Sequence, residues 1–342
     1  MLLMTALLLA GCTADDETTV QQDDTLQLAA YTRSYDDITR AAGYNRFEPD
    51  GVTSIGIFMT PFKDDQQTLG YFTYNGYSWR SNITLESDKY YIYGFMPGDV
   101  VDKSNCTITP LTGKTFADGA VLTLNGLKPI SKTDVCVIVG VGQTTSPSGD
   151  NNAQLGQFEY HKMAKGENFV HLLMNHIYSC VQFRMKVDAD YAQLRTIKLK
   201  RMELRSATIS STKAVITLTA NTSDENPITK VEWDTPTSGG GMSMVLFESE
   251  KGEALSTTTD LVLSGNLMPE CSDELSLVCT YDVYDSKGNL IRKDCVAPNK
   301  LPSSLALSSL KAGERQPINL TVTPTYLYVL SDPDLDNPDI TF

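Results

Sequence analysis

The sequence predicts an all-β protein with two β-sandwich domains in tandem. Short segments of alternating apolar and polar residues recur along the chain, separated by clusters of Gly, Pro, Asn, Asp and Ser. This pattern is typical of strands joined by turns. Helical periodicity is confined to two short stretches, 189–194 and 301–310. At about 150 residues per domain, 342 residues correspond to two domains. We place them at residues 25–167 and 168–342.

The chain begins with a predicted export signal, residues 1–11. Residues 2–10 are mainly apolar and too few to span a bilayer, which takes about 20 residues. Residues 9–12 read Leu-Ala-Gly-Cys and resemble a bacterial lipobox. This resemblance implies cleavage before Cys12 and attachment of acyl chains such as palmitate to its thiol. Residues 12–24 are polar and acidic, and we expect them to form a flexible tether.

The first domain shows its strands through alternation and turn residues. The predicted strands are 25–31, 52–59, 70–74, 77–79, 89–96 and 134–141. Leu26 and Leu28 share one face of the first strand because side chains alternate between the faces. The pair Asn75-Gly76 is a type I′ hairpin signal. Residues 134–141 are almost continuously apolar, as in a strand that is buried on both faces.

The second domain repeats the pattern and suggests one disulfide. The predicted strands are 169–176, 181–187, 196–209, 213–219, 275–284, 289–295 and 318–330. If Ser286, Lys287 and Gly288 form a three-residue loop, Cys279 and Cys295 are direct cross-strand neighbours. Export permits a disulfide between them. The alternative is that both remain free buried thiols.

Charge and motifs exclude several classes of function. The net charge of −14 leaves nothing to neutralise a row of phosphates, so we expect no nucleic-acid partner. There is no Cys-x-x-Cys pair, and His171 and His176 fall on opposite faces of a strand. We therefore predict no metal site and no cofactor. The chain also lacks a nucleophile elbow, a Walker loop and a dinucleotide fingerprint, so we predict no catalytic residues and no enzyme activity.

Four places in the chain together resemble the fimbrillin and fimbrillin-like (type V pilin) family of Bacteroidales. They are the lipobox with its acidic tether, residues 26–29 followed by Thr39-Arg40-Ala41, residues 50–58 with 91–97, and residues 175–183. The resemblance implies two transthyretin-like sandwiches and export as an outer-membrane lipoprotein to the cell surface and the fimbrium. It also implies assembly with other pilin subunits.

The resemblance further implies assembly by donor strand exchange. An arginine-specific protease removes the N-terminal segment in the family, and a strand of a neighbouring subunit then fills the vacated groove. Mapped onto this chain, residues 25–31 are the self-complementing strand, with Leu26 and Leu28 filling the groove. Arg40 is the preferred cleavage site, and Arg33 and Arg46 are the alternatives.

The predicted function is therefore that of a fimbrial subunit or a tip or accessory adhesin, with a host or bacterial receptor. Pro324 interrupts the last predicted strand, so residues 318–330 either include part of a donor strand or close the domain, with 331–342 as a turn-rich tail. One alternative is a glycan-binding surface lipoprotein, since Tyr71, Tyr74, Tyr77 and Trp79 could stack on sugars. A less favoured alternative is a cell-surface glycosidase.

Overall fold

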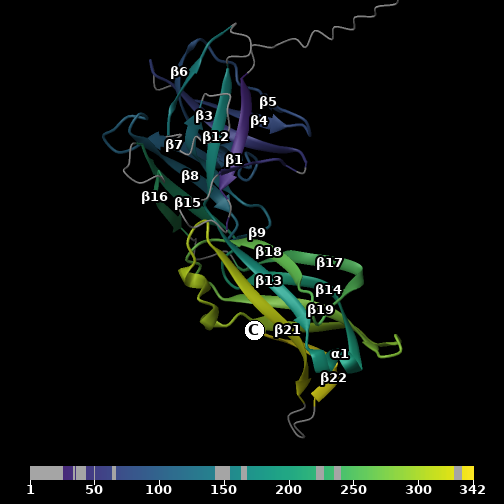
Figure 1. Ribbon diagram of the computed structural model, residues 1–342. Helices are drawn as coiled ribbons and strands as arrows, with labels where there is room; N and C mark the ends of the chain where they lie inside the picture. The colour runs from purple at the N-terminus through teal and green to yellow at the C-terminus, as the bar shows by residue number, and fades with distance from the viewer. Residues whose placement is uncertain are drawn as a thin grey trace, which may run out of the picture.

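The computed structural model describes residues 26–33, 35, 44–49, 51–63, 67–142, 155–162, 168–220, 227–234, 240–326 and 333–342. Four β-sheets dominate it (Figure 1). Within these ranges the one α-helix is α1 (Ala189–Leu194), whose first turn is capped by the Asp188 carboxylate. The all-β prediction is confirmed. None of the helices in the described ranges is long and apolar enough to cross a membrane.

Sheet 1 contains nine strands and includes the N-terminal strand. Its order is β2 (Tyr44–Arg46), β1 (Gln27–Arg33), β12 (Phe169–His176), β10 (Cys136–Gly142), β6 (Asp88–Met96), β3 (Thr53–Pro61), β4 (Thr68–Tyr74) and β5 (Trp79–Ser81), and β11 (Gln157–Tyr160) pairs with β6. Six of the seven residues of β10 are buried, as its continuous apolar run predicts. Its alternate side chains enter two different cores, one on each face of the sheet.

Sheet 2 joins strands that lie far apart in the sequence. It consists of β7 (Cys106–Pro110), β8 (Gly119–Leu127), β15 (Thr212–Thr219) and β16 (Ile228–Asp234). Strands β8 and β15 pair antiparallel, and both alternate cleanly, with Leu122, Leu124 and Ile216 fully buried between sheets 1 and 2. Both β12 and the β15–β16 hairpin therefore pair with strands that precede the linear division near residue 167.

Sheets 3 and 4 form the other half of the molecule, at the bottom of Figure 1. Sheet 3 is ordered β22 (Pro333–Thr341), β21 (Arg315–Tyr326), β13 (Ser179–Val187), β18 (Leu261–Leu267) and β9 (Ile130–Ser131). Sheet 4 is ordered β17 (Met242–Ala254), β14 (Arg195–Ser206), β19 (Leu275–Asp285) and β20 (Leu290–Lys300). Short 3₁₀ turns lie at Lys103–Asn105, Ser303–Leu305 and Leu307–Ser309. Much of the expected turn-rich tail is strand β22.

Two apolar cores hold these sheets. The large core runs from sheets 1 and 2 into sheets 3 and 4. The small core lies on the other face of sheet 1 and is formed by Leu26, Leu28, Ala30, Ile55, Ile57, Met59, Phe72, Leu85, Tyr90, Ile92, Met96, Cys136, Ile138, Val141, Phe158, Tyr160, Val170, Leu172 and Met174. The N-terminal strand, together with Leu26 directly before it, thus contributes three side chains to a core that is separate from the large core.

The β19–β20 hairpin starts with the predicted turn. Gly288 is left-handed at φ 84°, and its N–H donates to the carbonyl of Asp285 at 3.0 Å. Tyr284 pairs with Leu290, which is the register that a three-residue loop gives. The turn chemistry read from the sequence is therefore correct at the tip of the hairpin.

The predicted cysteine register is wrong further along that hairpin. The observed pairs are Cys279 with Ala297 and Cys295 with Tyr281. Two register shifts lie between the turn and the cysteines, and Asp294, near one of them, is left-handed at φ 54°. The Asp294 N–H donates to the Asp282 carboxylate at 2.9 Å, which holds the irregular backbone in place. Cys279 and Cys295 are free buried thiols, so the disulfide is not formed.

Candidate functional site

The N-terminal strand β1 lies at the margin of sheet 1. It pairs in parallel with β12, from Gln27 opposite Phe169 to Thr32 opposite Met174. Among the residues that the structure describes, the strand pairing on its other edge is with β2 alone, over Tyr31–Arg33. β1 is therefore attached to the body mainly through one ladder of hydrogen bonds.

The side chains of β1, and that of Leu26 directly before it, pack against the body on both faces. Leu26, Leu28 and Ala30 enter the small core, with exposed fractions of 5, 7 and 1%. Ala29 and Tyr31 point the other way and join the large core. Leu26 and Leu28 thus share one buried face, which is the arrangement that the alternation in the sequence predicts.

The seat of β1 has the properties of a strand-binding groove. Without β1, the N–H and C=O groups along one edge of β12 would lack their ladder partners. The buried side chains of Val170, Leu172 and Met174 line the small core beside that edge. An extended segment with small or aliphatic residues at alternate positions fits such a seat.

The structure describes two of the three candidate processing arginines. Arg33 is the last residue of β1 and is half-buried, and its carbonyl accepts a hydrogen bond from His176. Arg46 is the last residue of β2 and is exposed, with Nε 3.9 Å from Oε1 of Glu48. Arg40 lies outside the described residues, as does the lipidation candidate Cys12. Arg46 is therefore more accessible to a protease than Arg33.

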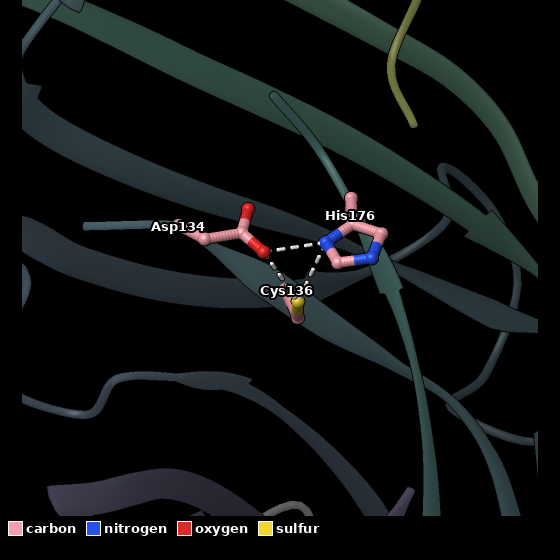
Figure 2. A group of neighbouring side chains, drawn as sticks. All are labelled: Asp134, Cys136 and His176. Carbon is pink, nitrogen blue, oxygen red and sulfur yellow. Dashed lines mark hydrogen bonds and ion pairs between the residues drawn. The ribbon is translucent and has the colours of Figure 1, made fainter. Parts of the chain in front are cut away.

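A polar group that we call the exit cluster meets the chain where it leaves β1. It consists of the Arg33 carbonyl, Tyr35, Asp134, Cys136 and His176 (Figure 2 shows the last three). Cys136 and His176 are paired across β10 and β12, so their side chains adjoin. Nδ1 of His176 lies 2.5 Å from Oδ2 of Asp134 and 3.3 Å from Sγ of Cys136.

The hydrogen bonds of the exit cluster fix the orientation of His176. A carbonyl only accepts, so Nε2 of His176 must donate its proton to the carbonyl of Arg33. Nδ1 therefore faces the Asp134 carboxylate and the Cys136 thiol. The hydroxyl of Tyr35 donates to Oδ1 of Asp134 at 2.5 Å, and its ring stacks on that of His176 with the centroids 3.9 Å apart.

Burial raises the pKa values of two weak acids of the exit cluster, the thiol of Cys136 and the hydroxyl of Tyr35. Burial, and then the charge of Asp134, raises the pKa of the Cys136 thiol well above its ordinary value. The same two causes raise the pKa of the Tyr35 hydroxyl. Both groups are therefore neutral unless a cation is close to them.

The aromatic residues proposed for sugar stacking are only partly brought together. The rings of Tyr74 and Trp79 contact each other at the base of the β4–β5 hairpin, with centroids 5.3 Å apart. Tyr77, in the four-residue loop of that hairpin, has an exposed fraction of 93%. Tyr71 lies under the ammonium of Lys103, 4.7 Å from its ring centroid.

The exit cluster is the feature that sequence reasoning missed. The spacing Asp134-x-Cys136 hints at it, because residues two apart on a strand face the same way. His176 is distant in sequence and becomes their neighbour only when β10 and β12 pair. The spacing of His176 from His171 carries no information about the neighbours that His176 has on β10.

The chain matches no protein-family model and no curated protein. It aligns with a cell adhesion candidate protein of Bacteroides fragilis over 93% of this chain and 96% of that one, at 11% identity and a TM-score of 0.46. A fimbrial protein of Bacteroides vulgatus aligns over 87 and 94%, at 12% identity and a TM-score of 0.37.

The fimbrial anchor protein Mfa2 of Porphyromonas gingivalis aligns over 92% of this chain and 95% of its own, at 11% identity and a TM-score of 0.27. At these scores the alignments carry no argument about residues or roles.

Proposed function

We propose that this protein is a non-enzymatic, surface-exposed fimbrial subunit or tip or accessory adhesin that accepts a donor strand from a partner subunit. The observation that carries the proposal is the seating of β1. It is a marginal strand with one long ladder, and its alternate side chains fill an apolar groove beside β12. A marginal strand of this kind can be replaced by another strand that refills the small core and takes the places of Ala29 and Tyr31 in the large core.

Release of β1 requires a cut between it and the body. An arginine-specific protease acting after Arg40 would separate β1 from β2 and the later strands, and one acting after Arg46 would separate β1 and β2 from the later strands. The exposure of Arg46 supports access there. The lipobox at Cys12 and the acidic tether support attachment to the outer membrane before that cut. The net charge of −14 makes copies of the chain repel one another, which opposes uncontrolled association of open strand edges.

Strand β22 supports a closing role for the C-terminal segment described. It folds back onto β21, and Arg195 binds Asp336 at 2.9 Å. Alternate positions of β22 carry Asp334 and Asp336 where an apolar groove would require aliphatic side chains. This strand therefore suits its own sheet better than the groove beside β12. Stalk and tip positions in a fimbrium both remain compatible with the proposal.

The test combines cleavage with strand replacement. The protein is digested with an arginine-specific protease, and its mass is measured under native conditions. Arg40→Lys and Arg46→Lys are matched controls, because each keeps the positive charge and removes the cleavage site. We expect loss of the N-terminal segment, followed by oligomers or by binding of a synthetic peptide of residues 25–33.

The peptide gives the decisive control. A peptide with Leu28→Asp should fail to bind, because a carboxylate would enter the small core. A cleaved protein that neither oligomerises nor binds the native peptide contradicts the proposal. Equal binding of the native and substituted peptides contradicts it as well, since the groove would then not select apolar residues.

One observation favours glycan binding as a second candidate function. The ring of Tyr77 is almost fully exposed near the Tyr74–Trp79 pair, and exposed aromatic rings can stack on sugars. A glycan array with the wild type and Tyr77→Ala tests it. Loss of a specific signal in the variant supports glycan binding, and the absence of any signal in the wild type opposes it.

A further inference from the structure

We propose that Asp134, Cys136 and His176 bind a thiophilic divalent cation such as Zn²⁺. The three side chains offer a carboxylate, a thiolate and an imidazole, the donor types that Zn²⁺ takes in proteins. All three donor atoms lie within 4.8 Å of one another, and Figure 2 shows the side chains converging. Cys136 is buried, whereas Asp134 is 29% exposed and gives ions a path in.

The distances are close to those of a coordination site. Sγ of Cys136 lies 3.3 Å from Nδ1 of His176 and 3.7 Å from Oδ2 of Asp134. Donor atoms of a tetrahedral zinc site are roughly 3.3–3.6 Å apart, given the usual bond lengths. Only the Oδ2–Nδ1 pair, at 2.5 Å, must open to admit the ion. A rotation of the 29%-exposed Asp134 carboxylate can provide that movement.

The surroundings prepare the ligands for a cation. The Nε2–H of His176 donates to the Arg33 carbonyl, which leaves the lone pair of Nδ1 free to coordinate. The Tyr35 hydroxyl donates to the second oxygen of Asp134 and orients that carboxylate. This is the outer-shell pattern of protein metal sites, in which each ligand is held by a further hydrogen bond.

Charge also favours a cation in the exit cluster. Without one, the lone pair of Nδ1 would face the Asp134 carboxylate, so a shared proton must hold the pair together. With Zn²⁺, the thiolate of Cys136 and the carboxylate of Asp134 balance the two positive charges. Binding releases the thiol proton of Cys136 and the proton shared by His176 and Asp134, so the affinity for the metal should rise with pH.

The site does not depend on strand exchange, and its test is separate. The purified protein, freed of metal by a chelator, is titrated with Co²⁺ as a spectroscopic probe. We expect one ion per chain, a sulfur-to-cobalt charge-transfer band, loss of that band when Zn²⁺ is added, and a higher Tm with Zn²⁺. Cys136→Ser should abolish the band, whereas Cys279→Ser, which removes another buried thiol, should keep it.

Two further variants distinguish loss of a metal ligand from misfolding as the cause of a lost cobalt band. His176→Gln should remove binding, and Tyr35→Phe should weaken Co²⁺ affinity about 10–100-fold while keeping the band at saturation. The wild type itself can overturn the proposal: if it takes up no Co²⁺ and its Tm is unchanged by Zn²⁺, a shared proton alone occupies the cluster. A band that persists in folded Cys136→Ser would also refute it.

Discussion

The two terminal strands of the described chain, β1 and β22, lie in opposite halves of the molecule (Figure 1) and are held by different interactions. β1 buries apolar side chains on both faces. On β22, Pro338 and Ile340 are buried and Leu335 is partly buried against the large core. Side-chain polar contacts also hold β22: the hydroxyl of Tyr191 donates to the carbonyl of Leu335, and Arg195 pairs with Asp336.

This difference bears on the proposed strand exchange. Apolar burial is strong, is not screened by salt as ion pairs are, and is reproducible by any strand with the same alternation. Ion pairs and single hydrogen bonds depend on particular partners and are individually weak. Under the proposed exchange, β1 is the strand that a partner's strand would replace, whereas β22 would stay paired with β21. Three substitutions test the contrast.

The largest effect is expected for Leu28→Ala in β1. The side chain is 7% exposed within the small core, and such truncations lower the free energy of unfolding by about 2–5 kcal/mol. Denaturant unfolding measures it. Leu290→Ala in β20 is the matched control, because Leu290 is 48% exposed and should change stability by less than about 0.5 kcal/mol. Equal effects of the two substitutions would contradict the tight seating of β1.

An intermediate effect is expected for Tyr191→Phe, which removes the hydroxyl that donates to the Leu335 carbonyl at 2.7 Å. Loss of one buried hydrogen bond costs about 0.5–1.5 kcal/mol. Hydrogen exchange of the β22 amides should quicken, with β1 unchanged. Tyr77→Phe is the control because its side chain is exposed. Unaltered exchange in β22 would mean that this hydrogen bond does not hold the strand.

The smallest effect is expected for Arg195→Ala. The Arg195–Asp336 pair is partly exposed, with exposed side-chain fractions of 20 and 43%, so its loss should cost about 0.2–1 kcal/mol. At about 1 M salt, where the Debye length is about 3 Å, wild type and variant should converge in β22 exchange. Arg184→Ala, which removes an exposed contact with Gln182, is the control. A salt-dependent change in the hydrogen exchange of β1, with none in β22, would contradict the contrast between the two strands.

Local patterns in the sequence predicted much of this fold. The alternation in residues 26–30 gives the shared face of Leu26 and Leu28, and the apolar run at 134–141 gives a strand buried on both sides. The left-handed Gly288 follows from the turn chemistry of its neighbours. Each of these features depends on residues a few positions apart, so each can be predicted without knowledge of strand pairing.

The failures concern pairing over long distances. The β20 bulge near Asp294 moved Cys279 and Cys295 out of register, and it depends on a hydrogen bond to the neighbouring strand. The placement of β15 beside β8 depends on two complementary apolar faces about 90 residues apart in the chain. Alternation alone cannot choose among such partners, because many strands present an apolar face.

The sequence by itself determined the all-β class, the apolar character of the first strand and the candidate arginines, because periodicity and residue type are local properties. Only the tertiary structure decided that β1 seats in parallel beside β12 and that Tyr35, Asp134, Cys136 and His176 meet at its exit. Those neighbours are selected by the mutual burial of whole strands, a cooperative choice that no short segment encodes.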